Sequence, residues 1–418
     1  MKKLAYLTLA LAAILINGCS NESLESTKVK VDESKKSLEF IILEDEALEM
    51  ATAFLNKGGT KTRSASSAEV KTIWRNITLD ASKSRNATES ETIEVPVYVV
   101  SYTDANAESD GYVVTVGDKR VMKPVLVYAD KGNWDLSEIP EFEELFWNGV
   151  DNSLTQTLSE SDADPCDTYE YEEKYEIERY AVDQFLTWGQ SSAPYNDSVP
   201  YCTSTGNNMP VGCVALAMGQ IMAKHEYPTS GSYIHQRYNR TVNATYNWAQ
   251  MKANNDARLL TTSQGRSGVA NILAEAGYKV DMEYGCGSSG AFSSDVPQAL
   301  RKMGYKSSTY NSFAFSHVIS SINYDNPVYI RGANTNSIGG SGHAWVVEGY
   351  KRYITDIISG SDCPEEYVPT ETITTSIDYF YFNLGWYGNS NGMYLYDIFE
   401  PWPYQYDIMI ITNITPDI

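Results

Sequence analysis

The stretch of sequence that decides the fold is Pro210–His225, which reads PVGCVALAMGQIMAKH. Pro210 to Gly212 predicts a turn, and the apolar residues after Cys213 recur at a spacing that predicts one buried face of a helix. These apolar residues are Val214, Ala217, Met218, Ile221 and Met222. Cys213 therefore lies in the first helical turn, where backbone N–H groups and the helix dipole favour an anion. Such a position can lower a thiol pKa to between roughly 3.5 and 7.5, whereas the plainer interpretation of Cys213 is a small buried apolar residue.

A base for this thiol is offered by Ser337–Tyr350, a Gly-rich loop that runs into an alternating strand beginning at His343. His343 follows Cys213 by 343 − 213 = 130 residues, a separation found between nucleophile and base in papain-like proteases. The other three histidines are placed less favourably. His225 lies near the end of the Cys213 helix, and we expect His235 in a polar loop and His317 on a surface helix.

Two shorter segments complete the candidate site. In Phe382–Gly388, Asn383 follows a strand and could hold an imidazole in the required tautomer, while Trp386 could shield that contact from water. In Trp188–Asn196, the side-chain amide of Gln190 could join the backbone N–H of Cys213 in an oxyanion hole. Each segment alone also fits an ordinary strand end or loop.

Taken in the order Gln, Cys, His and Asn/Trp, these segments resemble the streptopain family of bacterial papain-like cysteine proteases. The segments that carry the resemblance are Gly212–Ala215, Gln220–Met222, Tyr227–Pro228, Val280–Gly285, Ser288–Gly290, Gly342–Ala344, Val346–Val347, Asn383 and Gly385–Trp386, with Gly117–Arg120 resembling the family's inhibitory propeptide. The sequence departs from the family at Leu384, where Trp is frequent, and at Cys286, which interrupts a Tyr-Gly-Ser-Ser segment.

The resemblance implies an α+β fold, in which a small α+β inhibitory prodomain precedes a papain-like two-lobed cysteine protease domain. It implies Cys213 as nucleophile, His343 as base, Gln190 as oxyanion donor and Trp386 as a shield. Protein or peptide substrates are implied, with the prodomain as an intramolecular inhibitor and no metal or organic cofactor.

The N-terminus predicts export. Met1–Lys3 is basic, and Leu4–Ile16 is an apolar run of 13 residues, shorter than the 20 or so that span a membrane. The run ends in Ile-Asn-Gly-Cys, which resembles a bacterial lipobox and predicts removal of residues 1–18 with lipid attachment to Cys19. An ordinary secretory signal with an incidental cysteine is the alternative. We therefore expect a cell-envelope protein that is anchored by lipid to a membrane or the cell surface and can release its mature domain.

The rest of the chain divides by composition. Residues 19–36 predict a polar tether, and residues 37–150 a prodomain ending near Gly149, with a helix at Glu44–Lys57 and a loop at Lys57–Ala68. Short β-branched and aromatic runs predict antiparallel strands at Val97–Tyr102, Tyr112–Val116 and Val125–Tyr128. Nine acidic residues and one lysine between Ser159 and Arg179 predict a solvated linker over residues 151–181 that contains the activation cleavage. Residues 182–418 form the expected catalytic domain.

Charge and cysteine content exclude other classes. The formal net charge of −22 disfavours nucleic-acid binding, because phosphate backbones repel an acidic chain. Six cysteines without a C-x-x-C pair argue against a zinc ribbon or a thioredoxin-like site. With Cys213 free and Cys19 lipidated, the other four cysteines allow three pairings or none; they are Cys166, Cys202, Cys286 and Cys363.

The sequence therefore predicts a lipid-anchored zymogen of a cysteine endopeptidase. Two alternatives stay open: a Cys-His amidase acting on cell-wall peptides, and a non-catalytic surface binding protein on a degenerate protease scaffold.

Overall fold

The computed structural model describes residues 39–57, 65–80, 91–104, 110–161, 167–334, 342–361, 371–399 and 406–418. The predicted signal peptide, Cys19 and the tether lie outside the described residues. The N-terminal part consists of α2 (Glu44–Lys57), β1 (Ala65–Thr78), β2 (Thr92–Asp104), β3 (Asp110–Val116), β4 (Val125–Ala129) and α3 (Pro140–Glu160). The predicted helix and all three predicted antiparallel strands are confirmed. The predicted loop extends too far, because residues 65–68 already belong to β1 and pair with β2.

The predicted end of the prodomain near Gly149 falls inside helix α3, which continues to Glu160. Apolar residues continue at helical spacing on both sides of Gly149, and the helix begins with Pro140 at a position where its missing N–H costs nothing. The buried apolar side chains of this face are Phe142, Leu145, Phe146, Val150, Leu154 and Leu158. Glycine is required at 149, because a Cβ atom there would lie 2.4 Å from the carbonyl oxygen of Ile398.

The predicted solvated linker is also wrong. Residues 151–160 complete α3, and Asp167–Tyr180 form β5, which pairs antiparallel with β13 (Gly342–Ser361) over its whole length. Tyrosines alternate with acids along much of this segment, which is a strand period, and basic partners offset the negative charge. Lys351 of β13 is such a partner, with its Nζ 3.1 Å from Glu176 Oε2. In the opposite direction, Lys174 of β5 places its Nζ 2.6 Å from Asp356 Oδ2 of β13. A charged edge strand of this kind resists further pairing with other chains.

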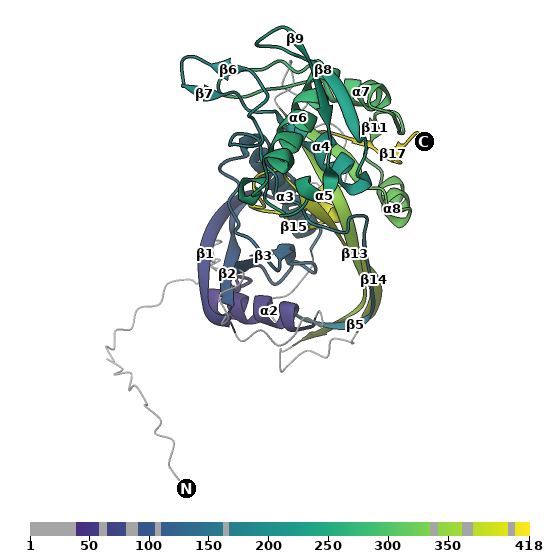
Figure 1. The fold of residues 1–418 in the computed structure, drawn as a ribbon. Coiled ribbons are helices and arrows are strands. Elements are labelled where there is room, and N and C mark those ends of the chain that lie inside the picture. The colour runs from purple at the N-terminus through teal and green to yellow at the C-terminus, as the bar shows by residue number, and fades with distance from the viewer. Residues whose placement is uncertain are drawn as a thin grey trace, which may run out of the picture.

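One large sheet runs through both parts of the protein. Among the described residues it has 11 strands, in the order β1-β2-β3-β4-β15-β14-β13-β12-β16-β11, with β5 beside β13. The C-terminal strands are β12 (Val328–Asn334), β14 (Thr372–Asn383), β15 (Gly392–Leu395), β16 (Tyr406–Ile411) and β11 (Asn311–Ser312). The N-terminal strands join the C-terminal ones where β4 pairs with β15, at Val127–Tyr394 and Tyr128–Met393. Figure 1 shows β1 and β2 facing β13, β14 and β5 across this curved sheet, with α2 closing the open end.

The α-helices of the C-terminal domain come from residues 213–323. α4 (Cys213–His225) packs against α6 (Ser263–Lys279) and β13, with α5 (Trp248–Met251), α7 (Val296–Lys302) and α8 (Phe315–Asn323) around them. Small two-stranded sheets form the periphery: β6 (Tyr201–Cys202) with β7 (Asn207–Asn208), β8 (Ser230–His235) with β9 (Arg240–Thr245), and β10 (Tyr305–Lys306) with β17 (Thr415–Pro416). In the described part of the chain, every helix is too short or too polar to cross a membrane.

Candidate active site

Cys213 begins helix α4, as predicted; the residue is partly buried, and its thiol is not in a disulfide. The preceding Gly212 has φ +85°, and a Cβ atom there would lie 2.8 Å from the Met282 sulfur, so glycine is required for both conformation and space. Burial is the main cause that raises the pKa of the Cys213 thiol. The N–H of Ala344 opposes this shift, and the carboxylate of Glu141 adds to it. The thiol in this structure is therefore a neutral one.

His343 lies near the start of β13, as predicted, and is only 4% exposed. Its Nε2 is 2.8 Å from the carbonyl oxygen of Leu384, which accepts a hydrogen bond from the ring. Burial lowers the pKa of His343 to about 4, so the imidazole is neutral at physiological pH. Within the described residues no hydrogen bond joins His343 to Cys213, and the two groups are not an ion pair in this state.

Helix α3 of the N-terminal part lies beside both residues. The Phe142 ring packs edge-on to the His343 ring, with centroids 6.3 Å apart, and to the Trp345 ring at 5.1 Å. Glu141, next to Phe142, is close enough to Cys213 to raise its pKa. The first turn of α3 therefore contacts the candidate base and acts electrostatically on the candidate nucleophile. The sequence analysis missed these two residues, although the 3.6-residue spacing through Phe142 was visible.

Gln190 lies close to the nucleophile turn, because its carbonyl oxygen accepts a 3.0 Å hydrogen bond from the N–H of Val211. The side chain of Gln190 is buried. Its segment packs against the turn after β14: the Tyr387 hydroxyl accepts a 3.0 Å hydrogen bond from the N–H of Ser191. Trp386, from the same turn, is half-buried, with its ring centroid 6.3 Å from that of Tyr387. The structure thus brings the predicted Gln and Trp segments together.

Asn383 does not hold the imidazole, in contrast to the interpretation from sequence. Its side chain points into a different, fully buried network: Nδ2 donates to Glu348 Oε1 at 2.9 Å and to the Leu186 carbonyl at 2.7 Å. Its Oδ1 accepts from Gln220 Nε2 at 3.0 Å and from the Gly385 N–H at 3.2 Å. All four hydrogen-bonding positions of the amide are therefore used, and the contact to His343 comes from the main chain one residue later.

Glu348 is the carboxylic acid of this network, and its pKa is strongly shifted by burial. It is 3% exposed, and burial raises the pKa of its carboxyl to about 8, while the hydrogen bond from Asn383 opposes the shift. Sequence reasoning missed Glu348 because an acid in an alternating strand usually faces solvent. The network joins α4 through Gln220, β13 through Glu348 and the 384–388 turn through Asn383, so it supports the elements that carry the candidate site.

The other histidines are not at the site. His225 ends α4, and His317 is exposed on α8, as expected. His235 is not in a polar loop but ends β8, where it is 8% exposed. No cluster of three or more metal-binding side chains occurs among the described residues. Of the four cysteines whose pairing was open, Cys202 and Cys286 form a disulfide, whereas Cys166 and Cys363 lie outside the described residues.

Comparison with known proteins gives two family matches. Residues 188–394 match the Peptidase C10 family, and residues 39–154 match the Spi protease inhibitor. The chain is similar to the thiol protease/hemagglutinin PrtT of Porphyromonas gingivalis, 27% identical over 328 residues that make up 70% of this chain and 33% of PrtT. It is also similar to streptopain of Streptococcus pyogenes, 26% identical over 329 residues that make up 71% of this chain and 74% of streptopain.

Among solved structures, a fragment of prointerpain A from Prevotella intermedia aligns with 81% of this chain and 98% of its own, at 18% identity and a TM-score of 0.48. The matched region spans only one third of PrtT but about three quarters of streptopain. The N-terminal match covers the strands and most of α3, and the C-terminal match contains Cys213, His343, Gln190, Asn383 and Trp386. The chain belongs to the Peptidase C10 family of cysteine peptidases, with a Spi-type inhibitor segment preceding its peptidase domain.

Proposed function

We propose that this chain is the zymogen of a cysteine endopeptidase that is exported, anchored through a lipid on Cys19, and inhibited by its own N-terminal domain. Its substrates are proteins and peptides. The observation that carries the proposal is the position of α3, whose first turn contacts His343 through Phe142 and acts on Cys213 through Glu141.

The proposed chemistry uses Cys213 as nucleophile. The thiolate attacks the peptide carbonyl carbon, and the oxyanion that forms is stabilised by the Gln190 side-chain amide and the N–H of Cys213. His343, protonated when it takes the thiol proton, gives that proton to the leaving amine as the C–N bond breaks. It then removes a proton from water, which attacks the thioester and releases the acid product and the thiol.

Latency follows from the state of the two groups. A cysteine and a histidine that form a thiolate-imidazolium pair must lie within hydrogen-bonding distance, and here the imidazole bonds to the Leu384 carbonyl beneath the Phe142 ring. Glu141 adds a negative charge that disfavours the thiolate. Departure of α3 would remove both effects and leave the imidazole free to reach the thiol.

Activation is proposed to occur by a cut between the end of α3 and the start of β5, within residues 160–167. Residues inside a packed helix or a paired strand resist proteases, because the chain must unfold locally to enter a protease cleft. A cut there would leave β5 paired with β13 in the mature enzyme.

The test compares the wild-type chain with Cys213→Ala. Purified wild type should shorten to a product beginning near residues 160–167, and casein hydrolysis should rise after this cut, while the Ala variant stays intact and inactive. A truncated protein starting near Asp167 serves as the control for full activity. If the intact chain is already as active as that control, the N-terminal domain is not an inhibitor. Release of cell-wall fragments without casein cleavage would favour an amidase instead.

Anchoring is tested separately in a bacterial host. The wild-type chain should incorporate a labelled fatty acid and fractionate with membranes, and Cys19→Ser should do neither. Equal fractionation of both would assign Cys19 to an ordinary secretory signal.

A further inference from the structure

A loop formed by residues 283–290 lies directly against the turn that carries Cys213. A Cβ atom at Gly212 would lie 2.8 Å from the Met282 sulfur and 2.9 Å from the carbonyl oxygen of Ser289. The main chain of this loop is thus in contact with the residue preceding the nucleophile. Any displacement of the loop therefore changes the surroundings of the turn that carries Cys213.

Only the first residues of the loop are packed: Tyr284 lies against the core beside Gly277 of α6, whereas the middle of the loop has few contacts. Its ends are joined by two backbone hydrogen bonds between Glu283 and Gly290, at 2.9 and 3.1 Å, and the Gly285 N–H donates to Ser289 Oγ at 3.3 Å. In its middle, residues 286–288 are exposed, and a Cβ atom at Gly287 would meet no atom within 4 Å. The Gly- and Ser-rich middle of the loop, residues 285–289, therefore has high conformational entropy unless something else restrains it.

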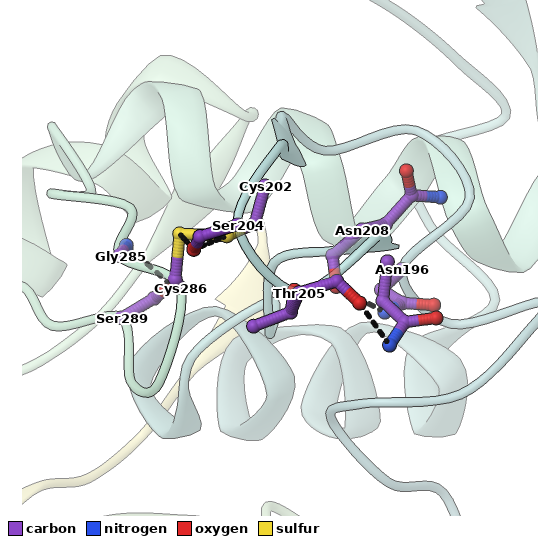
Figure 2. The surroundings of a disulfide bond; sticks show 9 residues. Asn196, Cys202, Ser204, Thr205, Asn208, Gly285, Cys286 and Ser289 are labelled. Atoms are coloured by element: carbon purple, nitrogen blue, oxygen red, sulfur yellow. Dashed lines mark hydrogen bonds between the residues drawn. A yellow bond between two sulfur atoms is a disulfide. The ribbon is translucent and has the colours of Figure 1, made fainter.

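The restraint is the Cys202–Cys286 disulfide, which Figure 2 shows between the loop and the β6–β7 hairpin. Cys202 is 1% exposed, so this end of the bridge is fixed in the protein. The hairpin is in turn held by Asn196, whose Nδ2 donates to the Asn208 carbonyl at 3.1 Å and to the Ser191 carbonyl at 3.0 Å. The bridge therefore connects the loop beside Cys213 with the segment that contains Gln190.

We propose that the Cys202–Cys286 disulfide is a positioning element of the peptide-binding cleft, and that its reduction weakens peptide binding without disabling the thiol. The inference rests on the proposed peptidase function. Cys202 and Cys286 touch neither reacting group; they act through the loop. An extended peptide must bind beside the turn that carries Cys213, whereas a small alkylating agent needs only the thiol.

The redox step balances with a dithiol as the reductant. The thiolate of the dithiol attacks the sulfur of Cys286, an exposed residue, to form a mixed disulfide, and Cys202 leaves as a thiolate that takes up a proton. The second thiol of the reagent then attacks its own sulfur in the mixed disulfide, which closes a cyclic disulfide and releases Cys286 as a thiol. The products are two protein thiols and one oxidised dithiol. The buried position of Cys202 directs attack to the Cys286 side.

The experiment measures peptide kinetics on processed wild type and on processed Cys202→Ser/Cys286→Ser, with rates divided by the fraction of sites titrated by an epoxide inhibitor. We expect KM to rise about tenfold in the double variant, with kcat within about twofold. Without the disulfide, the entropy cost of ordering the loop must be met when the peptide binds, which weakens binding. Dithiothreitol should raise KM of wild type to the same value and leave the double variant unchanged. Iodoacetamide should alkylate Cys213 at the same rate in both proteins.

A second measurement does not depend on activity. In the intact chain, amide hydrogen exchange in peptides covering residues 283–290 should be faster in the double variant than in wild type, with α6 as the unchanged internal reference. Equal KM with and without the disulfide, or equal exchange of the loop, would overturn the proposal. If wild type hydrolyses no peptide at all, the proposed function fails, and the exchange result still decides whether the bridge orders the loop. If the double variant does not fold, dithiothreitol treatment of folded wild type provides the same comparison.

Discussion

Replacing Glu348 by Gln should remove a pH dependence from the stability of the zymogen. The Glu348 carboxyl is 3% exposed, and burial raises its pKa from an ordinary 4.5 to about 8. Between these values the folded state binds a proton that the unfolded state does not. The stability contributed by the carboxyl is thus complete below pH 4.5 and is lost as pH rises toward 8. With these two pKa values, the loss between pH 5 and pH 7 is about 2.5 kcal/mol.

The Gln side chain has nearly the same shape, and its carbonyl oxygen can accept the hydrogen bond that Asn383 donates to Glu348 Oε1. Burying the Gln amide can change the free energy of unfolding by a constant amount, but this amount does not depend on pH. Both proteins carry Cys213→Ala to prevent self-cleavage, and urea unfolding is followed by tryptophan fluorescence between pH 5 and 8. The buried His343, which acts with the opposite sign between about pH 4 and 6.5, cancels in the difference between the two proteins.

The variant should therefore gain about 2.5 kcal/mol relative to its parent between pH 5 and pH 7. A difference that stays constant within about 0.5 kcal/mol over this range would refute the reasoning, because it would mean that the carboxyl has the same pKa in both states.

Three further outcomes follow from the site. Phe142→Ala should destabilise the zymogen by about 3–5 kcal/mol and shorten the lag before self-processing, because it removes the buried ring beside His343. Phe142→Leu, which keeps most of the side-chain volume, is the control, and an unchanged lag in the Ala variant would contradict the role of α3. In the intact chain, iodoacetamide should alkylate Cys213 only as the pH rises above 9.0, because burial raises the thiol pKa above that ordinary value; alkylation at pH 6 as fast as in the processed enzyme would disagree. Gln190→Ala in the processed enzyme should lower kcat by about 10²–10³ with little change in KM, and a change in KM alone would assign Gln190 to substrate binding.

The sequence predicted those elements whose signal is contained within a single segment. Glu44–Lys57 and the helix after Cys213 have a local apolar period, and the strand from His343 alternates over its first residues, so each could be identified without knowing its neighbours. The residues of the candidate site were identified by type and order, and the structure places Gln190 close to Cys213 through Val211.

The parts that sequence reasoning missed depend on distant partners. Taken alone, the acids of β5 predict a solvent-exposed segment. In the structure this segment forms a strand because its main chain pairs with β13 and Lys351 forms an ion pair with Glu176. The amide of Asn383 has nothing in its own segment to bind, and its direction is set by Gln220 and Glu348, which come from two other elements. Neither outcome can be read from spacing, because both depend on which side chains the fold brings into contact.

The sheet that continues from β4 into β15 implies that cleavage and activation are separate events in time. After a cut near residues 160–167, the severed N-terminal domain is still held by main-chain hydrogen bonds between β4 and β15, by the ion pair of Lys123 with Asp397, and by the Tyr112 hydroxyl on the Asn391 carbonyl. In such a cleaved complex, β4 must first separate from β15 before the N-terminal domain can leave. The lifetime of this complex, rather than the speed of the cut, would then set the delay between processing and the first substrate cleavage. Dissociation of the cut domain is a unimolecular step, so dilution would not change its rate. Dilution would only prevent the released domain from binding again.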